Sequence, residues 1–195
     1  MIDEKIYDYV KSKLKKKRFI HTQGVQYTAS CLAMRYNCDL NKAELAGFLH
    51  DVAKNLDDDE LIKFCEKKSI KVKKFHRASP FLLHGPVGSY IAEHELGIKD
   101  KDILNAIANH TTGRTKMSLL EKIVFIADYI EPGRDKAPNL ETIRKLAFED
   151  IDKCIVMVYE NTFSYINETQ GKLKIDPISL KAYEYYKDMV SESYE

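Results

Sequence analysis

Six histidine and aspartate side chains stand at positions where a helix would ordinarily place an apolar residue. His50 and Asp51 are adjacent in the segment GFLHDVAKNL, beside the apolar residues Leu49 and Val52. An ionised carboxylate in a protein core costs several kcal/mol unless it is paired or bound to a metal. The other four groups also lie at inward-facing or terminal positions of expected helices: His21, His84, His110 and Asp128.

Each of these residues alone has an ordinary structural explanation. Asp128 could form a single salt bridge with Arg134 or Arg144, and a lone His21 or His110 could be a hydrogen-bonded core histidine. The six groups come from five separate helical segments, however, and independent coincidences of this kind have a small combined probability. One or two metal ions would satisfy all six groups at once.

The types of the six side chains restrict the metal. Mixed nitrogen and oxygen ligands without a thiolate suit iron, manganese, cobalt, nickel or zinc. Six protein ligands exceed the usual four of a zinc centre, which favours two metals with open positions. We expect the remaining histidines to be solvated, because His76 lies in the basic stretch KKFHRAS and His94 lies between Glu93 and Glu95.

Helical periodicity dominates the chain, and no segment alternates convincingly in the manner of a strand. One predicted helix begins with Asn41 as its cap and Glu44 as its capping-box partner, and it continues to Leu56. The spacing also predicts a helix from Pro86 to Gly97, and two more over about 141–149 and 151–168. A last helix is expected to be capped by Asp176 and opened by Pro177. We therefore predict a single all-α domain over residues 1–195.

Composition excludes several classes of protein. The 195 residues are 44% apolar, which is enough for a real core, and 31 Lys and Arg balance 30 Asp and Glu. A net charge of +1 does not suggest a bulk nucleic-acid binder, and no apolar run approaches the length that spans a bilayer. The four cysteines are scattered without a CxxC pair, and the N-terminus lacks the apolar segment of a secretory signal. We expect a reduced, cytoplasmic protein that binds neither nucleic acid nor membranes.

The order of these residues resembles a known family. His21, His50-Asp51 and Asp128 resemble the metal-binding signature of the HD superfamily of metal-dependent phosphohydrolases, and the additional His84 and His110 resemble its binuclear branch. The resemblance extends from about Arg18 to Arg134 and continues more weakly into the C-terminal helices. The segments that most resemble the YqeK-type symmetrical bis(5′-nucleosyl)-tetraphosphatases, in that order, are RFIHTQGV, LAGFLHDVAK, HGPVGSYIA, NAIANHTTGR and VFIADYIEPGR.

This resemblance implies an HD-type helical bundle with a di-iron centre that splits diadenosine tetraphosphate into two ADP. By the same resemblance, His84 and His110 complete the site of a second metal, and Asp51 bridges the two ions. The first metal would be held by His21, His50, Asp51 and Asp128. Both ions would be divalent or trivalent, with iron expected and manganese, cobalt, nickel or zinc as alternatives.

The expected reaction is attack of a metal-activated hydroxide on a phosphoanhydride. Asp51 would orient this hydroxide as well as bridge the metals, and we assign His50 and Asp51 as the catalytic pair. Cleavage in the middle of the tetraphosphate expels ADP, which is a stable anion. A strong general acid is therefore not required.

A polyanionic substrate also needs cations and hydrogen-bond donors. Lys54 lies one turn after His50, Arg134 follows Asp128 by six residues, and Thr111 directly follows His110. Gly24, three residues after His21, could let a ligand approach the backbone, or it could only permit close helix packing. Lys54 could equally be a solvated lysine. We predict contacts to the substrate from six residues: Gly24, Lys54, His84, His110, Thr111 and Arg134.

Other functions stay open from the sequence alone. A second HD-type nucleotide hydrolase, such as a nucleotidase or a cyclic-dinucleotide phosphodiesterase, would share the chemistry and differ in its pocket. A di-iron oxygenase or a non-catalytic module that keeps metal for stability would not release phosphate from a nucleotide. The tyrosine-rich tail KAYEYYKDMV could supply a homodimer contact, although such tyrosines more often pack within the chain.

Overall fold

The computed structural model describes residues 2–169 and 174–192. Every regular element in these residues is a helix, which confirms the all-α prediction. The elements are α1 (Glu4–Lys13), α2 (Lys16–Tyr36), α3 (Leu40–Leu49), α4 (Asp58–Lys67), α5 (Lys74–Ala78), the 3₁₀ helix η1 (Pro80–Leu83), α6 (His84–His94), α7 (Lys101–Asn109), α8 (Leu119–Ile130), α9 (Leu140–Glu149), α10 (Ile151–Glu168) and α11 (Pro177–Glu192).

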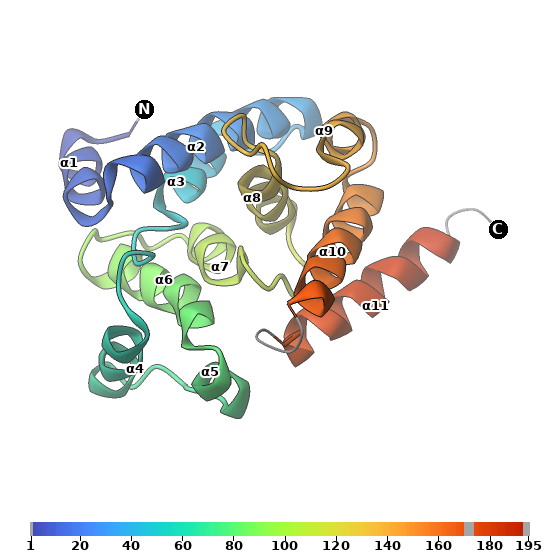
Figure 1. The fold of residues 1–195 in the computed structure, drawn as a ribbon. Coiled ribbons are helices and arrows are strands. Elements are labelled where there is room, and N and C mark those ends of the chain that lie inside the picture. Colours follow the sequence, from blue (N-terminus) through green and yellow to red (C-terminus); the bar gives the residue numbers. More distant parts are fainter. Residues whose placement is uncertain (1, 170–173, 193–195) are drawn as a thin grey trace.

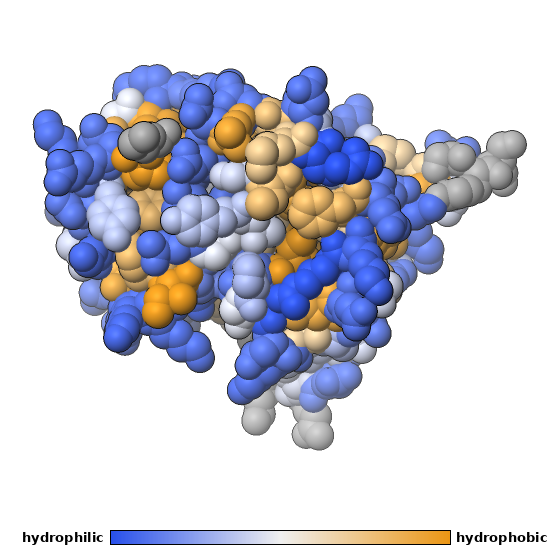
Figure 2. All heavy atoms as spheres, turned by 90° about the horizontal axis from the view of Figure 1, so that it is seen from above, coloured by the Kyte–Doolittle hydropathy of each residue, from blue (hydrophilic) through white to orange (hydrophobic). Residues whose placement is uncertain are grey.

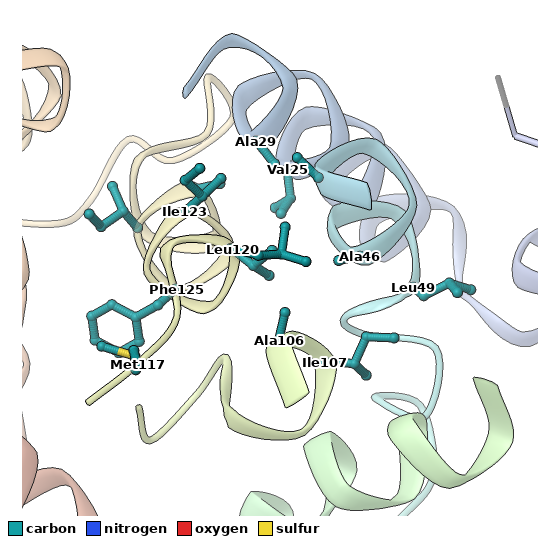
Figure 3. Close-up of a cluster of buried hydrophobic side chains, with 14 of the residues drawn as sticks. Val25, Ala29, Ala46, Leu49, Ala106, Ile107, Met117, Leu120, Ile123 and Phe125 are labelled. Carbon is teal, nitrogen blue, oxygen red and sulfur yellow. The ribbon is translucent and has the colours of Figure 1, made fainter. Parts of the chain in front are cut away.

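The core lies between α2, α3, α7 and α8, which pack against one another in the upper and middle part of Figure 1. Figure 3 shows side chains of all four helices facing a shared interior, with Val25 of α2, Ala46 of α3 and Ala106 of α7 directed toward Leu120 of α8. All four side chains are at most 1% exposed. Small residues such as alanine let helices approach closely, so this packing brings the polar residues of four helices near one another.

Side-chain caps fix where several helices begin. Asp57 and Glu60 form a reciprocal capping box at the start of α4, and Ser118 and Glu121 form another at the start of α8. At the last helix, the Asp176 carboxylate accepts hydrogen bonds from the backbone N–H groups of Ile178 and Ser179. The predicted cap at Asp176 and start at Pro177 are therefore confirmed.

The predicted boundaries of two other helices are wrong. The cap of α3 is Asp39, whose carboxylate accepts from the N–H of Lys42, and Asn41 lies inside the helix. The same helix ends at Leu49, and residues 50–56 form successive turns in place of further helix. Likewise, α6 begins at His84 because η1 leads directly into it, so Pro86 lies within its first turn. Both corrections place a candidate metal ligand at a helix end.

The C-terminal helices pack on the core and on each other. Asp150 caps α10 immediately after α9 ends, which confirms the predicted absence of a loop between them. Tyr186 of α11 is fully buried, and its hydroxyl accepts a hydrogen bond from the N–H of Met117. At Tyr186, the tyrosine-rich segment therefore packs within the chain.

The outer face of α2 carries three exposed apolar side chains at seven-residue spacing, Ile20, Tyr27 and Met34. Figure 2 views the molecule from the side on which α2 lies and shows apolar groups scattered among hydrophilic ones. No helix within the described residues combines the length and apolar composition that crossing a bilayer requires. All four cysteines are free, as their scattered spacing predicts.

A stability prediction concerns the loop after α7. Gly113 has a φ of +60°, and a Cβ there would overlap the hydroxyl of Tyr159. We expect Gly113→Ala to lower the free energy of unfolding by more than the roughly 1–2 kcal/mol that a left-handed backbone costs an alanine. Gly97 is a matched control, because it has a φ of +74° with no atom near its Cβ position.

Chemical denaturation of both variants separates the two contributions. Gly97→Ala reports the backbone cost alone, and Gly113→Ala reports that cost together with displacement of Tyr159. Equal losses of stability in the two variants would show that the Tyr159 contact at Gly113 contributes nothing.

Candidate metal centre

Five helical segments bring the six predicted side chains together. His21 comes from α2, His50 and Asp51 follow the last residue of α3, and Asp128 lies in the last turn of α8. His84 is the first residue of α6, and His110 follows the last residue of α7. His50, Asp51, His84 and His110 are buried, whereas His21 and Asp128 are partly accessible. The site therefore has a closed interior and one accessible side.

Asp51 lies at the centre of this cluster. Its Oδ2 atom lies 3.4 Å from His50 Nε2 and 3.7 Å from His21 Nε2. Its Oδ1 atom lies 3.3 Å from His84 Nε2 and 3.5 Å from His110 Nε2. Each carboxylate oxygen thus faces a different pair of imidazoles, which is the arrangement that a carboxylate shared by two ions needs.

The chain fixes the orientation of three imidazoles through the backbone. His50 Nδ1 lies 2.7 Å from the carbonyl oxygen of Gly47, three residues earlier, and His84 and His110 make the same contact with Phe81 and Ile107. A carbonyl oxygen can only accept, so Nδ1 must carry the proton in all three rings. In the neutral form of each ring, the lone pair is then on Nε2, the atom that faces Asp51.

Several buried atoms of the cluster lack a hydrogen-bond partner. Among the described residues these include His21 Nε2, His50 Nε2 and Asp51 Oδ1. His21 Nε2 does lie 3.1 Å from Asp128 Oδ1, but without the geometry of a hydrogen bond. A buried polar atom without a partner costs about 1–3 kcal/mol. A bound cation would satisfy all of these atoms, so the donor set fits a metal.

The ligand atoms form three overlapping groups whose members lie within 4.8 Å of one another. Together these groups include all six predicted side chains, and His50, Asp51 and His110 each belong to two of them. The three groups are His21, His50 and Asp51; His50, His110 and Asp128; and Asp51, His84 and His110.

The surroundings of three clustered side chains shift their pKa values toward the protonation states that bind a metal. Burial lowers the pKa of His84 to about 4, so this imidazole is neutral near pH 7 and its free nitrogen lone pair can bind a metal. Burial would raise the pKa of Asp51, but the neighbouring His50, His110 and His84 outweigh it and hold that pKa well below its usual value. The pKa of Asp128 is lowered in the same way, against burial, by His21, His50 and Arg134.

Two further residues touch the cluster and were not among the sequence predictions. Glu131 Oε1 lies 3.0 Å from Nδ1 of His21, and Arg18 Nη1 lies 2.8 Å from Asp51 Oδ2. A carboxylate behind a ligating histidine orients the ring and raises its basicity. Both residues lie three positions from a predicted ligand on the same helix face, Arg18 before His21 and Glu131 after Asp128. This spacing could have revealed them.

The predicted substrate contacts occupy different places around the cluster. Lys54 Nζ lies 3.2 Å from His84 Nε2, and Thr111 Oγ1 lies 3.0 Å from His110 Nε2. Arg134 pairs with Asp128 at 2.8 Å, so the simple salt bridge considered for Asp128 also forms. All three side chains therefore lie at the cluster, and their contact with a substrate stays a prediction.

Gly24 has a structural role of its own. A Cβ at this position would lie 2.5 Å from Glu131 Oε2. The absence of a side chain therefore makes room for the carboxylate that contacts His21. Contact between Gly24 and a substrate stays a prediction.

One of the two histidines set aside from the site differs from expectation. His76 is only 7% exposed, because the short α5 turns its ring back to accept a hydrogen bond from the N–H of Lys73. The expectation that it is solvated is wrong. His94 is exposed, as predicted, and its ring stacks on Tyr90.

Comparisons with known proteins agree with the geometry. The family model described as the HD domain matches residues 18–133, which contain all six clustered side chains. A solved structure described as a predicted HD superfamily hydrolase involved in NAD metabolism, from Clostridium acetobutylicum, superposes with a TM-score of 0.92 at 40% identity. The match covers 97% of this chain and 99% of that one.

Curated bacterial proteins named "Bis(5'-nucleosyl)-tetraphosphatase, symmetrical" are also similar. The Bacillus subtilis (strain 168) protein is 40% identical over 80% of this chain and 83% of its own length. The Halalkalibacterium halodurans protein is 43% identical over 83% and 86%, respectively. The Staphylococcus aureus (strain NCTC 8325 / PS 47) protein is 41% identical over 84% of each.

Proposed function

Because the chain belongs to the HD domain family, we propose that it is a metal-dependent hydrolase that cleaves diadenosine tetraphosphate symmetrically into two ADP. The observation that carries this proposal is the convergence of six donor side chains in one cluster with Asp51 at its centre, with buried ligand atoms that have no partner within the described residues. Similarity over more than four-fifths of the curated tetraphosphatases supports the choice of substrate.

We assign the ligands as the resemblance implies. His21, His50, Asp51 and Asp128 would hold one ion, and His84 and His110 would hold a second that shares Asp51. The two oxygens of Asp51, each facing a different histidine pair, support this division. Iron is the proposed metal because the family resemblance implies it; the mixed imidazole and carboxylate ligands would also accept manganese, cobalt, nickel or zinc. A metal in such a site supplies activation of water and neutralises the charge of phosphate oxygens.

The chain's own residues position the reactants. Asp51 accepts a hydrogen bond from the attacking water and aligns it with the central phosphoanhydride. Lys54, Arg134 and Thr111 contact the non-bridging phosphate oxygens. A new bond forms between the water oxygen and one inner phosphorus, and the bond from that phosphorus to the central bridging oxygen breaks. The half that keeps the central oxygen leaves as ADP, the half that gains the water oxygen is the second ADP, and one proton of the water passes to solvent. The departing ADP has a charged terminal phosphate and needs no strong acid.

Identification of the products tests this function. Metal-loaded protein incubated with diadenosine tetraphosphate should release ADP alone, because only the central bond is aligned. A mixture of ATP and AMP would contradict symmetrical cleavage. Faster turnover of mononucleotides or cyclic dinucleotides would favour another hydrolase of the family, and oxygen consumption without phosphoanhydride cleavage would favour an oxygenase. Protein stripped with a chelator is the control.

A further inference from the structure

A cavity of about 170 Å³ lies beside the candidate metal centre, where α8, α10 and α11 meet. One side of it is formed by His110 and Asp128, which belong to the cluster described above, and by Thr111, which lies next to His110. The cavity therefore begins where the phosphates of a substrate would lie. The remaining lining residues come from the three helices and are Phe125, Tyr129, Val158, Tyr159, Thr162 and Ser179.

The lining of the cavity combines two kinds of side chain. The charged or metal-ligating groups, His110 and Asp128, both belong to the candidate metal centre. The rest of the lining is mainly aromatic and aliphatic, with the rings of Phe125 and Tyr159 5.0 Å apart between centroids. Aromatic walls with a few hydroxyl groups are typical of sites that bind a flat heteroaromatic ring.

The wall of the cavity is hydrogen-bonded to the loop that carries His110 and Thr111. The carbonyl oxygen of Thr112 accepts hydrogen bonds from the hydroxyls of Tyr159, at 2.9 Å, and Ser179, at 3.0 Å. Thr112 directly follows His110 and Thr111, so α10 and α11 hold this loop in place. These hydrogen bonds fix the position of the cavity wall relative to His110, and therefore relative to the candidate metal centre.

We propose that this cavity binds a nucleobase of the dinucleotide substrate and that α10 and α11 provide the subsite. The inference rests on the proposed function, since it takes a nucleotide as the ligand. Both helices lie beyond residues 18–133, the part matched by the HD domain family. The HD segment then supplies the chemistry, and the C-terminal helices recognise the nucleoside.

A filled cavity tests the proposal. Thr162 is half-buried at the cavity, and its hydroxyl bonds only within its own helix, to the carbonyl of Val158. In Thr162→Phe the added ring occupies the space assigned to the base. Ser164→Phe is the matched control, because Ser164 is exposed on the same helix and does not line the cavity.

The measurement is calorimetric binding of ADP and of pyrophosphate to the metal-loaded protein. Pyrophosphate has no base, so the ratio of the two affinities isolates the base contribution. We expect Thr162→Phe to lower the preference for ADP over pyrophosphate by about 10-fold or more, the loss typical of one stacked base. Ser164→Phe should keep the wild-type ratio.

An unchanged ratio in Thr162→Phe, or equal weakening of both ligands, would overturn the assignment of the cavity. If Thr162→Phe does not fold, Thr162→Leu fills less of the cavity, and it should also lower the ratio of the ADP affinity to the pyrophosphate affinity. Hydrolysis of diadenosine tetraphosphate is measured separately. A normal ADP product with an unchanged ratio refutes only the base subsite, whereas a lowered ratio without hydrolysis refutes only the proposed activity.

Discussion

The Asp51→Ala variant is expected to lose more than about 100-fold in kcat/KM for diadenosine tetraphosphate. Removal of a residue that only supports a metal ligand costs about 10–100-fold, and Asp51 faces four imidazoles at once. Its loss removes the shared ligand and the group that aligns the water. The checks are steady-state hydrolysis and metal content of the same preparation.

Two further variants make this result interpretable. Asp51→Asn keeps the shape of the side chain, so it separates loss of the charge from a packing defect around a residue that is 2% exposed. Asp188→Ala removes an exposed carboxylate from α11, and it should behave like the wild type. Hydrolysis by Asp51→Asn within about 3-fold of the wild type would remove Asp51 from the centre of the mechanism.

The second large effect is expected at Glu131, which we propose as a positioning residue. Its buried carboxylate accepts from Nδ1 of His21 and from the N–H of Gly133. Glu131→Ala frees the His21 ring to rotate, so metal affinity should fall by about 10–100-fold. Metal titration of the stripped protein measures this directly, without reference to turnover.

The conservative variant distinguishes orientation from general stability. Glu131→Gln keeps an oxygen that can accept from His21, so it should recover part of the lost affinity. Glu141→Ala serves as the control for removal of a glutamate, because Glu141 is an exposed side chain paired only along its own helix, with Lys145. Wild-type metal affinity in Glu131→Ala would show that His21 does not depend on this contact.

Helix positions were predictable wherever local sequence signals determine them. Asp176 and Pro177 mark the start of the last helix through a local cap and a fixed φ, and the structure agrees. The end of α3 was missed because apolar spacing continues through Val52 and Leu56 after the helix stops at Leu49. Periodicity cannot distinguish a helix from successive turns that bury the same side chains.

The clustering of the six polar side chains was predictable, because buried polar groups at apolar positions are rare unless they pair with one another or share a ligand. The residues behind them were missed: Glu131 and Arg18 each lie three positions from a predicted ligand, but both resemble ordinary surface charges until the helices are packed. The cavity could not be predicted from the sequence either. Most of its lining comes from α8, α10 and α11, so only the packing of these helices brings Phe125, Tyr159 and Thr162 around one cavity.

The most direct test of the metal centre is elemental analysis of anaerobically purified protein. The two oxygens of Asp51, each facing a different pair of imidazoles, predict two metal ions per chain, with one fewer in His84→Ala, which keeps the four ligands assigned to the other ion. Full hydrolysis of diadenosine tetraphosphate by protein that holds no metal, before or after chelation, would contradict the account.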